Sequence, residues 1–393
     1  MLWRTMTSVC STNPEQLTEA ELDFLCLLTA QGRQRLQRIA RNSQPAAADD
    51  GQGFPSVPAT PAARAAMLEQ ARNSGRPAGD PRRRRQPGSP ARFRDQLQRG
   101  ELRVLWHEQL PLALRQVPDP PWALYLRGNP DALHAAAVAI VGARTATARG
   151  CRWTRQLARE LSTAGLTIVS GLALGIDAAG HQGCLDARAA PTIAVLGSGA
   201  DQPTPRQHAR LASAIVAGGG ALLSEYAPGQ GARAHHFPER NRLVSGLALG
   251  LVVVEATERS GSLITARLAL EQGRELMAVP GPVGLPNSAG CHRLLRQGAT
   301  LVTGAAEVLE AIGRGELAPA RVRAAEPPDL EHRFAATDVQ LAQQLYLACD
   351  AVAQPMAVLV EIVQGDPARV AHVLTLLELH GLIQRSGVGY VRR

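Results

Sequence analysis

The sequence AVAIVGARTATARG at residues 137–150, followed by LTIVSGLALGID at residues 166–177, decides the fold. Each stretch opens with a short apolar run of the length and β-branched content typical of a buried parallel strand. Each run then reaches a glycine, Gly142 or Gly171, and continues into a helical pattern. This geometry directs unpaired backbone N–H groups and a helix dipole at an anion. The two stretches therefore predict parallel strands whose ends bind an anion.

The same unit recurs further along the chain. Strands are expected near Ala137–Val141, Thr167–Val169, Thr192–Leu196, Ala221–Ser224, Leu251–Glu255, Leu276–Val279 and Thr300–Val302. Helical segments lie between most of them; in the first, Trp153, Leu157 and Leu161 recur four apart and form one apolar face. The pattern predicts a doubly wound, mainly parallel α/β sheet with right-handed crossovers.

Composition narrows the classes of function. The chain has 393 residues, is 45% hydrophobic and carries a net charge of +8, so it can bury a large core and suits a polyanionic partner such as nucleic acid. All 42 cationic side chains are arginine, which excludes a P-loop lysine and a Schiff-base lysine. The six cysteines are scattered, with no C-x-x-C pair, as expected for reduced thiols in a cytoplasmic protein without a metal site. The first ten residues, MLWRTMTSVC, lack the apolar run of a signal peptide, so none is expected, and the longest apolar stretch, Val244–Ala256, is too short to predict a membrane span.

Changes in composition divide the chain. We expect a helical N-terminal region (1–41), a Pro/Ala/Arg-rich disordered insertion (42–90), a lead-in to the core (91–135), the core itself (136–312), a linker (313–333) and a C-terminal winged helix (334–393). In the insertion, Arg82–Arg85 could hold a phosphate backbone or could be part of a solvated tether. The last helix, Pro367–His380, is poor in cations, which favours a protein-interaction or dimer-supporting role over groove reading.

Small residues follow several of the expected strands and would converge on one crevice. They are Gly142-Ala143-Arg144, Ser170-Gly171, Gly197-Ser198-Gly199 and Ser260-Gly261-Ser262. None matches G-x-G-x-x-G, so a dinucleotide site has little support. Four converging loops favour anion binding, although Ser262 could simply be an N-cap.

The segment HHFPERNR at residues 235–242 adds an aromatic ring between cations. Phe237 could stack on a base while the arginines hold phosphates, or it could be buried and anchor the loop. Asp177 and Glu255 could act in acid–base chemistry, but such carboxylates more often cap helices or pair with arginines.

These loops, in this order and spacing, resemble the bacterial DNA-processing protein A (DprA, or Smf) family. The resemblance covers roughly residues 102–312 and includes VGAR (141–144), SGLALGID (170–177), FPERNR (237–242) and AVPG (278–281). It implies an extended Rossmann-like domain that binds single-stranded DNA without base specificity, loads the RecA recombinase in natural transformation, works as a cytoplasmic homodimer and is not an enzyme. No cofactor or membrane partner is expected.

The resemblance also implies roles for individual residues. Arg144 would hold a phosphate beside Gly142, Ser170 and Gly171 would offer donors near Gly175, and Phe237 would stack between bases. Arg240 and Asn241 would shape the pocket, and Ser260, Gly261, Ser262 and Thr265 would complete its phosphate-holding wall. Each stacked base would contribute roughly 1–3 kcal/mol.

The sequence departs from the family in three places. Leu174 stands where the family usually carries a cation, His292 replaces the usual asparagine, and the N-terminal region lacks the usual G-x-G hairpin. We hypothesise that Arg82–Arg85 compensates for Leu174. The rival hypothesis is a nucleotide-hydrolysing enzyme of the phosphoribohydrolase type, for which Glu271 would be the downstream glutamate. The loop before it, RSGSLIT (259–265), does not match the P-G-G-x-G-T loop of those enzymes.

Overall fold

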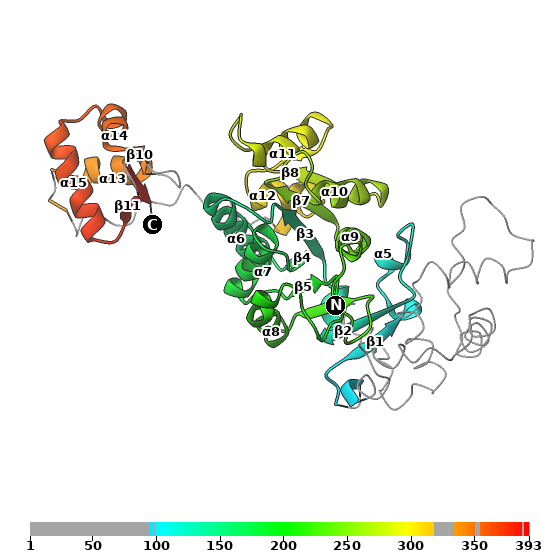
Figure 1. Cartoon of the computed structure of the whole chain (residues 1–393). Helices are drawn as coiled ribbons and strands as arrows, with labels where there is room; N and C mark the ends of the chain where they lie inside the picture. The colour runs from blue at the N-terminus through cyan, green and yellow to red at the C-terminus, as the bar shows by residue number, and fades with distance from the viewer. Residues whose placement is uncertain are drawn as a thin grey trace, which may run out of the picture. The chain divides into compact units, whose positions relative to one another are not determined.

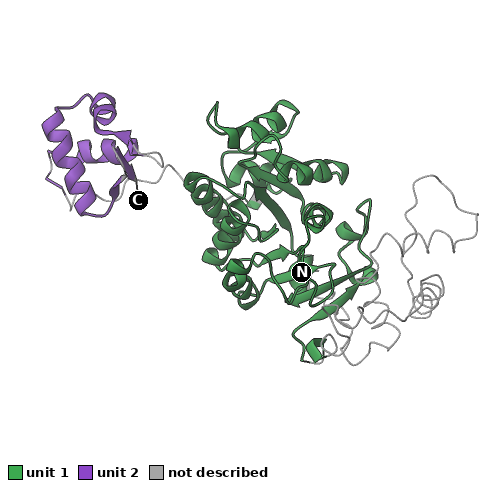
Figure 2. Ribbon diagram, in the orientation of Figure 1, with its two compact units in different colours: residues 1–319 green, residues 320–393 purple. Residues whose placement is uncertain are grey.

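The computed structural model describes residues 95–97, 99–317, 330, 334–335, 337–349, 354–386 and 389–392. The predicted N-terminal helices, the insertion with Arg82–Arg85 and most of the predicted linker lie outside the described residues. The chain divides into two compact units, Met1–Pro319 and Ala320–Arg393 (Figure 2).

Unit 1 is built on a nine-stranded sheet with the order β1-β2-β6-β5-β4-β3-β7-β8-β9 (Figure 1). The β1–β2 and β2–β6 pairs are antiparallel and every other pair is parallel, which confirms the predicted mainly parallel sheet. The strands are β1 (Arg103–Trp106), β2 (Ala123–Gly128), β3 (Ala137–Gly142), β4 (Thr167–Ser170), β5 (Thr192–Val195), β6 (Ala221–Ser224), β7 (Gly250–Val254), β8 (Glu275–Ala278) and β9 (Thr300–Leu301).

Helices cover both faces of this sheet (Figure 1). Alternate strand residues separate into two cores: Ile140 and Ile168 pack with the helices of one face, and Val141 and Val169 with those of the other. The first face carries α6 (Ala148–Thr163), α7 (Ile176–Ala187), α8 (Ala209–Ala217) and α12 (Ala305–Ala311); the second carries α5 (Leu112–Arg115), α9 (His236–Gly246), α10 (Ser262–Glu271) and α11 (Pro286–Arg296). Short 3-10 turns are η3 (His107–Gln109), η4 (Pro130–His134), η5 (Arg206–His208) and η6 (Gly315–Leu317).

Helix α6 shows how the local sequence sets these elements. Thr147 is its N-cap, and the Thr147 hydroxyl accepts the Gly150 N–H at 2.9 Å. Leu157 and Leu161 are buried against the sheet and Trp153 packs at the edge of the same core, as their spacing predicts. The apolar face therefore fixes how the helix lies on β3 and β4.

The order of the strands predicts a crevice at the carboxyl ends of the neighbouring strands β3 and β7. The chain runs outward from β3 through β4 and β5 to β6, then returns to form β7 on the other side of β3. In an open parallel sheet the loops that leave the strand ends diverge at such a reversal, and ligands bind there. Most of the predicted site residues lie in the loops after β3, β4 and β7, at the strand ends before these loops, or in the first turn of α10.

Unit 2 contains α13 (Val339–Ala348), α14 (Met356–Val363) and α15 (Pro367–Leu379). A three-stranded antiparallel sheet of β10 (Gln354–Pro355), β12 (Gly389–Arg392) and β11 (Ile383–Ser386) accompanies them. Asp366 caps α15 by accepting the Arg369 N–H at 3.0 Å. The assignment of this unit as a winged helix stays a prediction.

Candidate nucleic-acid interface

An arginine and an aromatic ring from distant parts of the chain meet at the crevice. Arg144 lies in the loop after β3, is exposed, and holds its guanidinium carbon 5.0 Å from the centroid of the Phe237 ring. Phe237 lies in the first turn of α9 and is half-buried, with its ring against Gly197. This is the distance of a cation–π contact, and it leaves both groups accessible to a ligand. Phe237 is therefore not fully buried, as the alternative of a buried anchor would require: one part of its ring packs on Gly197 and another part stays exposed.

Arg240 is buried beneath this pair. Only 5% of Arg240 is exposed, and its Nη2 donates to the Gly171 carbonyl at 3.1 Å. A Cβ on Gly171 would lie 2.5 Å from the Arg240 Cζ, so glycine is required for the guanidinium to pack there. Arg240 thus connects α9 to the loop after β4 through this hydrogen bond.

Asp177 completes this buried arrangement. Its Oδ2 accepts the N–H groups of Gly171 at 3.1 Å and of Ala173 at 3.3 Å. Ser170 is also buried, and its hydroxyl donates to the Ile140 carbonyl at 2.6 Å. The Gly171 N–H, one of the backbone donors that the resemblance implies, is therefore engaged within the protein, as is the Ser170 hydroxyl. These two residues form the base of the crevice.

Burial and mutual attraction oppose each other in the Asp177–Arg240 pair. Burial raises the pKa of Asp177 and lowers the pKa of Arg240, while the charge of each partner opposes the shift of the other. The Arg144 charge further lowers the pKa of Arg240. Because the pair is neutral as a unit, the charge presented to a ligand comes from Arg144.

Glycines bring the loops after β3 and β4 into contact. Gly175 adopts φ +74°, and a Cβ there would lie 2.8 Å from the Arg144 carbonyl oxygen. A Cβ on Gly142 would lie 2.7 Å from the Ile176 Cγ1. The structure therefore brings together Gly142, Arg144, Gly171, Gly175, Phe237 and Arg240. Ser170 belongs to the same group because it directly precedes Gly171.

The loop after β7 forms a separate group of small residues. The Ser260 and Ser262 hydroxyls lie 2.6 Å apart, and Gly261 is exposed with nothing within 4 Å of a Cβ position. The N-cap of α10 is Gly261, one residue earlier than Ser262, while Ser262 and Thr265 are buried. Among the described residues, no hydrogen bond or ion pair joins this group to Arg144 or Phe237. The strand order alone places it near them.

The glycine loop at residues 197–199 and Asn241 are less open than the sequence predicts. Gly197, Ser198 and Gly199 are all buried, and the Gly199 N–H donates to the Gln230 carbonyl at 2.8 Å. The segment around residues 227–230 covers this loop, so its expected role as an open anion-binding loop is wrong. Asn241 is half-buried, and its carbonyl accepts the Ser245 hydroxyl at 3.3 Å.

The two carboxylates considered for acid–base chemistry have positioning roles. Glu255 adopts φ +50°, and its side chain accepts the Thr147 N–H at 2.8 Å and the Asn287 amide at 3.3 Å. It therefore links the loops after β3 and β7 to α11. A left-handed non-glycine residue at a strand end is strained backbone of the kind that clusters at binding sites. Its signal in the sequence, a lone glutamate after a β strand, is too common to be specific.

A ring stack was missed by sequence reasoning. Tyr226 and His236 are stacked with centroids 3.8 Å apart, and the His236 Nδ1 lies 2.9 Å from the Gly197 carbonyl. The stack anchors the start of α9, and hence Phe237. Of the family departures, Leu174 is 38% exposed beside Gly175, and the His292 Nε2 lies 2.9 Å from the Gly281 carbonyl. His292 thus makes a hydrogen bond that joins α11 to the loop between β8 and α11.

Within the described residues, no cluster of three or more His, Cys, Asp or Glu side chains could hold a metal ion. In the same residues, no helix has the length and apolar character needed to cross a membrane. The crevice therefore offers an exposed arginine, a ring and small-residue loops as its binding chemistry.

Comparison with known proteins identifies the family of the chain. The family model for DNA recombination-mediator protein A matches residues 101–313. Protein Smf of Escherichia coli K12 is 43% identical over 288 residues, which are 72% of this chain and 75% of that protein. The DNA processing protein DprA of Streptococcus pneumoniae R6 is 42% identical over 199 residues, 51% of this chain and 70% of that protein.

Two solved structures share the fold. The X-ray structure of DprA from Streptococcus pneumoniae superposes with a TM-score of 0.55 and 33% identity, covering 75% of this chain and 98% of that one. DNA processing protein A from Helicobacter pylori superposes with a TM-score of 0.50 and 30% identity, covering 55% of this chain and 96% of that one. The Helicobacter pylori structure was described for that protein's unique mode of binding single-stranded DNA.

Proposed function

The chain belongs to the DNA recombination-mediator protein A family, and from this premise we propose that it binds single-stranded DNA in the crevice after β3, β4 and β7. The observation that carries the proposal is the contact between Arg144 and Phe237. An exposed guanidinium that neutralises a phosphate beside a ring that stacks on a base is the minimal unit of sequence-independent single-strand binding. The name of the Helicobacter pylori structure, which refers to single-stranded DNA, supports the same ligand.

The proposal divides the predicted site residues by task. Arg144 and Phe237 touch DNA directly, and Ser260 and Gly261 form the opposite wall, which the buried Ser262 and Thr265 support from within. Gly142, Ser170, Gly171, Gly175, Arg240 and Asn241 shape and hold the crevice rather than contact the strand. This division follows from exposure, because buried donors with internal partners are not available to a phosphate.

A role beyond DNA binding follows from the family. We propose that the protein acts as a homodimer in the cytoplasm and delivers bound single strands to the RecA recombinase in natural transformation. Light scattering of the purified protein reports its oligomeric state. RecA filament formation on single strands coated with single-strand-binding protein, with and without this chain, tests delivery; no acceleration would refute it.

We assign the protein no catalytic step. The rival hydrolase would need Glu271 near the loop of Ser260 to Ser262, yet Glu271 ends α10 while Ser262 begins it. At 1.5 Å per residue the two are roughly 13 Å apart along the helix. Glu271 also lies 3.5 Å from Arg267, on the surface. Release of free base from nucleoside monophosphates, lost in Glu271→Ala, would overturn this assignment.

Fluorescence anisotropy with single-stranded and duplex oligonucleotides over a salt series tests the binding proposal. We expect the single strand to bind more tightly. Arg144→Ala should reduce the salt slope by about 0.7, the value for one phosphate contact on a single strand. Phe237→Ala should cost roughly 1–3 kcal/mol at every salt concentration. Arg115→Ala, which removes an exposed arginine from α5, is the matched control. If neither crevice substitution matters, or duplex binds equally well, the crevice is not the DNA site.

A further inference from the structure

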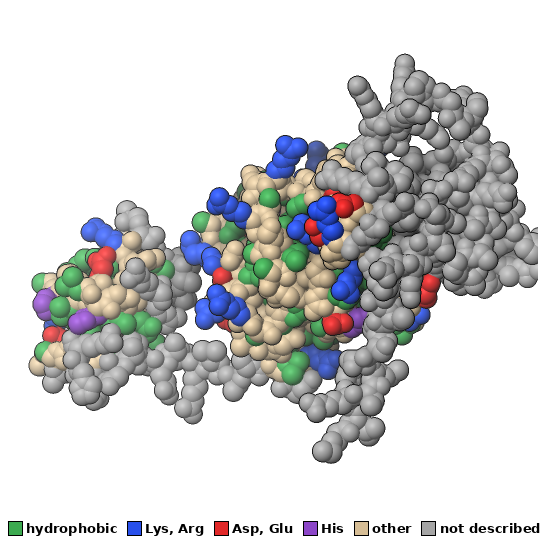
Figure 3. Space-filling view, turned by 90° about the horizontal axis from the view of Figure 1, so that it is seen from below, with side chains coloured by type: hydrophobic (Ala, Val, Ile, Leu, Met, Phe, Trp, Pro, Cys, Tyr) green, Lys and Arg blue, Asp and Glu red, His purple; other side chains and the backbone are tan. Residues whose placement is uncertain are grey.

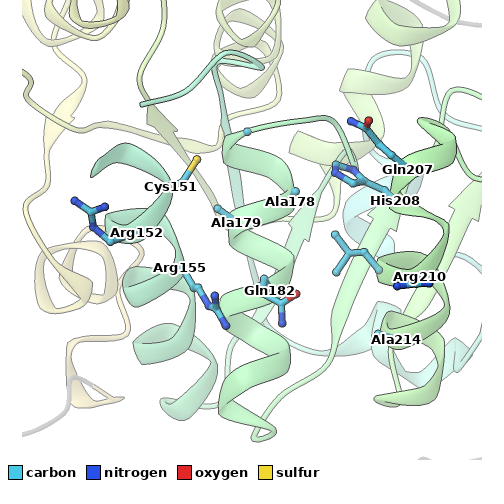
Figure 4. A pocket seen from close by; sticks show the side chains of 12 residues that line it. Cys151, Arg152, Arg155, Ala178, Ala179, Gln182, Gln207, His208, Arg210 and Ala214 are labelled. Carbon is cyan, nitrogen blue, oxygen red and sulfur yellow. The ribbon is translucent and has the colours of Figure 1, made fainter. Parts of the chain in front are cut away.

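A second basic groove opens on the outer surface of the first helical layer. It has a volume of about 670 Å³ and lies between α6, α7 and η5–α8 (Figure 4). Its floor is Ala178 and Ala179 of α7, and taller side chains of the neighbouring helices form its walls. The residues that line it are Cys151, Arg152, Arg155, Gly175, Ala178, Ala179, Gln182, Gln207, His208, Arg210, Leu211 and Ala214.

The charge of the lining selects an anion. Arg152 and Arg155 border the groove on α6, and Arg210 borders it on α8, whereas no carboxylate is among the described residues that line it. Arg155 forms an ion pair with Asp186, while Arg152 and Arg210 have no ion-pair partner within the described residues. Figure 3 shows blue side chains gathered on the edge of unit 1 where α6 and α7 lie in Figure 1. The uncompensated charge would attract a phosphate-bearing ligand.

The groove begins where the crevice ends. Gly175 lines the groove and also abuts the backbone of Arg144, since a Cβ on Gly175 would lie 2.8 Å from the Arg144 carbonyl oxygen. On the opposite wall, the His208 Nδ1 lies 2.8 Å from the carbonyl of Leu172, in the same loop after β4. One loop therefore borders both sites, and a ligand that leaves the crevice past Gly175 enters the groove.

The length and surface of the groove suit a polymer better than a small anion. From Gly175, the N-cap of α7, to Gln182 it follows the helix for about 10 Å at 1.5 Å per residue, which is longer than a single phosphate group. Figure 4 shows Gln207 and His208 on the α8 side of the groove, and Arg155 and Gln182 pointing toward one another on the other side. Amides and guanidinium groups above an alanine floor offer phosphate contacts on the rim and apolar contact for sugars below.

We propose that this groove binds the phosphodiester backbone of the same single strand beyond the crevice. This inference rests on the proposed function, because the crevice supplies the strand. The groove lengthens the footprint without reading bases, so its contribution grows with oligonucleotide length and falls with salt.

Oligonucleotide length separates the groove from the crevice. We would measure anisotropy with dT6, which the crevice alone can hold, and with dT20, which reaches the groove. The groove variant is Arg152→Gln with Arg210→Gln. The matched control is Arg103→Gln with Arg115→Gln, which removes the same charge from exposed positions on β1 and α5 that do not line the groove. Gln207→Glu is a second variant, which places a negative charge on the groove wall without changing its shape.

Three results support the proposal. The groove variant loses about tenfold in affinity for dT20 at low salt, and its salt slope falls by about 1.4, the value for two phosphates. Its affinity for dT6 stays within twofold of the wild type. Gln207→Glu weakens only dT20, and the control pair changes neither oligonucleotide.

Other results overturn it. Unchanged dT20 affinity and slope in both groove variants would show that the strand does not enter the groove. Equal losses for dT6 and dT20, or equal losses in the control pair, would show a general effect of charge. Competition of dT20 by inorganic phosphate at millimolar concentration only in the wild type would indicate a free-anion site. If the wild type binds neither oligonucleotide, or Arg144→Ala leaves dT6 binding unchanged, the proposed function itself fails.

Discussion

Replacing Gly171 with alanine should damage the crevice through a single contact. The new methyl group would overlap the Arg240 guanidinium and lie 2.5 Å from its Cζ. Arg240 is 5% exposed and bonded to the Gly171 carbonyl, so its guanidinium has no open space into which to move. Overpacking a buried site costs about 1–3 kcal/mol, and loss of a hydrogen bond from a charged donor costs about 1.5–3 kcal/mol. The two overlap in cause, so we expect a loss of about 3 kcal/mol in unfolding free energy.

Urea unfolding of the full chain, followed by circular dichroism, measures this loss, and anisotropy measures the accompanying loss of single-strand affinity. Gly261→Ala is the control within the same crevice, because nothing lies within 4 Å of its Cβ position and its φ is −61°. It should change the unfolding free energy by less than about 0.5 kcal/mol.

A double-mutant cycle identifies the cause. In an Arg240→Met background the long guanidinium is absent, so Gly171→Ala should lose most of its cost; contacting residues couple by about 0.5–3 kcal/mol. If Gly171→Ala costs as much in the Arg240→Met background as in the wild type, the clash with Arg240 is not the cause. A Gly171→Ala protein as stable as the wild type would refute the packing described here.

Three further predictions follow from single contacts. Burial lowers the pKa of His181 from 6.5 to about 3 and favours its neutral form in the folded state. The stabilising contribution of neutral His181 is therefore present above pH 6.5 and is lost toward pH 3. In this range the unfolding free energy changes by up to about 1.4 kcal/mol per pH unit. His181→Asn should flatten this slope in urea titrations between pH 6.5 and 4, where the raised pKa of Asp177 acts in the opposite direction; an unchanged slope would contradict the burial argument. Glu255→Gln replaces the carboxylate that accepts from Thr147 and Asn287 and should lower the unfolding free energy by about 1–2 kcal/mol. The control, Glu258→Gln at an exposed position, should leave it unchanged. Equal effects of the two variants in calorimetry would count against the role of Glu255 in linking these loops. Leu174→Arg restores a cation at a 38% exposed position and should raise the salt slope of single-strand binding by about 0.7. The control is Leu270→Arg, which adds the same charge at an exposed position on α10. An equal rise of the salt slope in the two variants would show an effect of net charge alone.

The sheet was predictable because its signals are local. Short apolar runs predicted the seven strands β3 to β9 to within two residues, and the spacing of Leu157 and Leu161 predicted the buried face of α6. The pairing of β2 with β6 was not predictable in this way. It joins Tyr125 to Ser224, about a hundred residues apart, and depends on how the sheet closes at its edge.

The candidate site was predicted by type but not by exposure. Arg144 follows a glycine and Arg240 follows an aromatic residue, and the sequence predicts both beside a ligand. In the structure Arg144 is exposed and Arg240 is buried. A signal was present: His236, Arg240, Leu243 and Val244 follow helical spacing and share the buried face of α9. The use of the Gly171 N–H by Asp177 was not visible, because it depends on a close turn between β4 and α7.

The difference between the two arginines explains how one crevice can be both rigid and electrostatically active. Arg240 is buried, donates to the Gly171 carbonyl and is attracted by the charge of Asp177, so dissolved salt screens this attraction far less than it screens exposed charges. Its attraction to Asp177 therefore persists when salt weakens DNA binding, and the loop after β4 keeps its shape. In the proposed function, Arg144, exposed above the Phe237 ring, would exchange its counterions for a phosphate. A strand can thus be released by changing the charge interactions at the surface while the buried pair preserves the crevice for the next one.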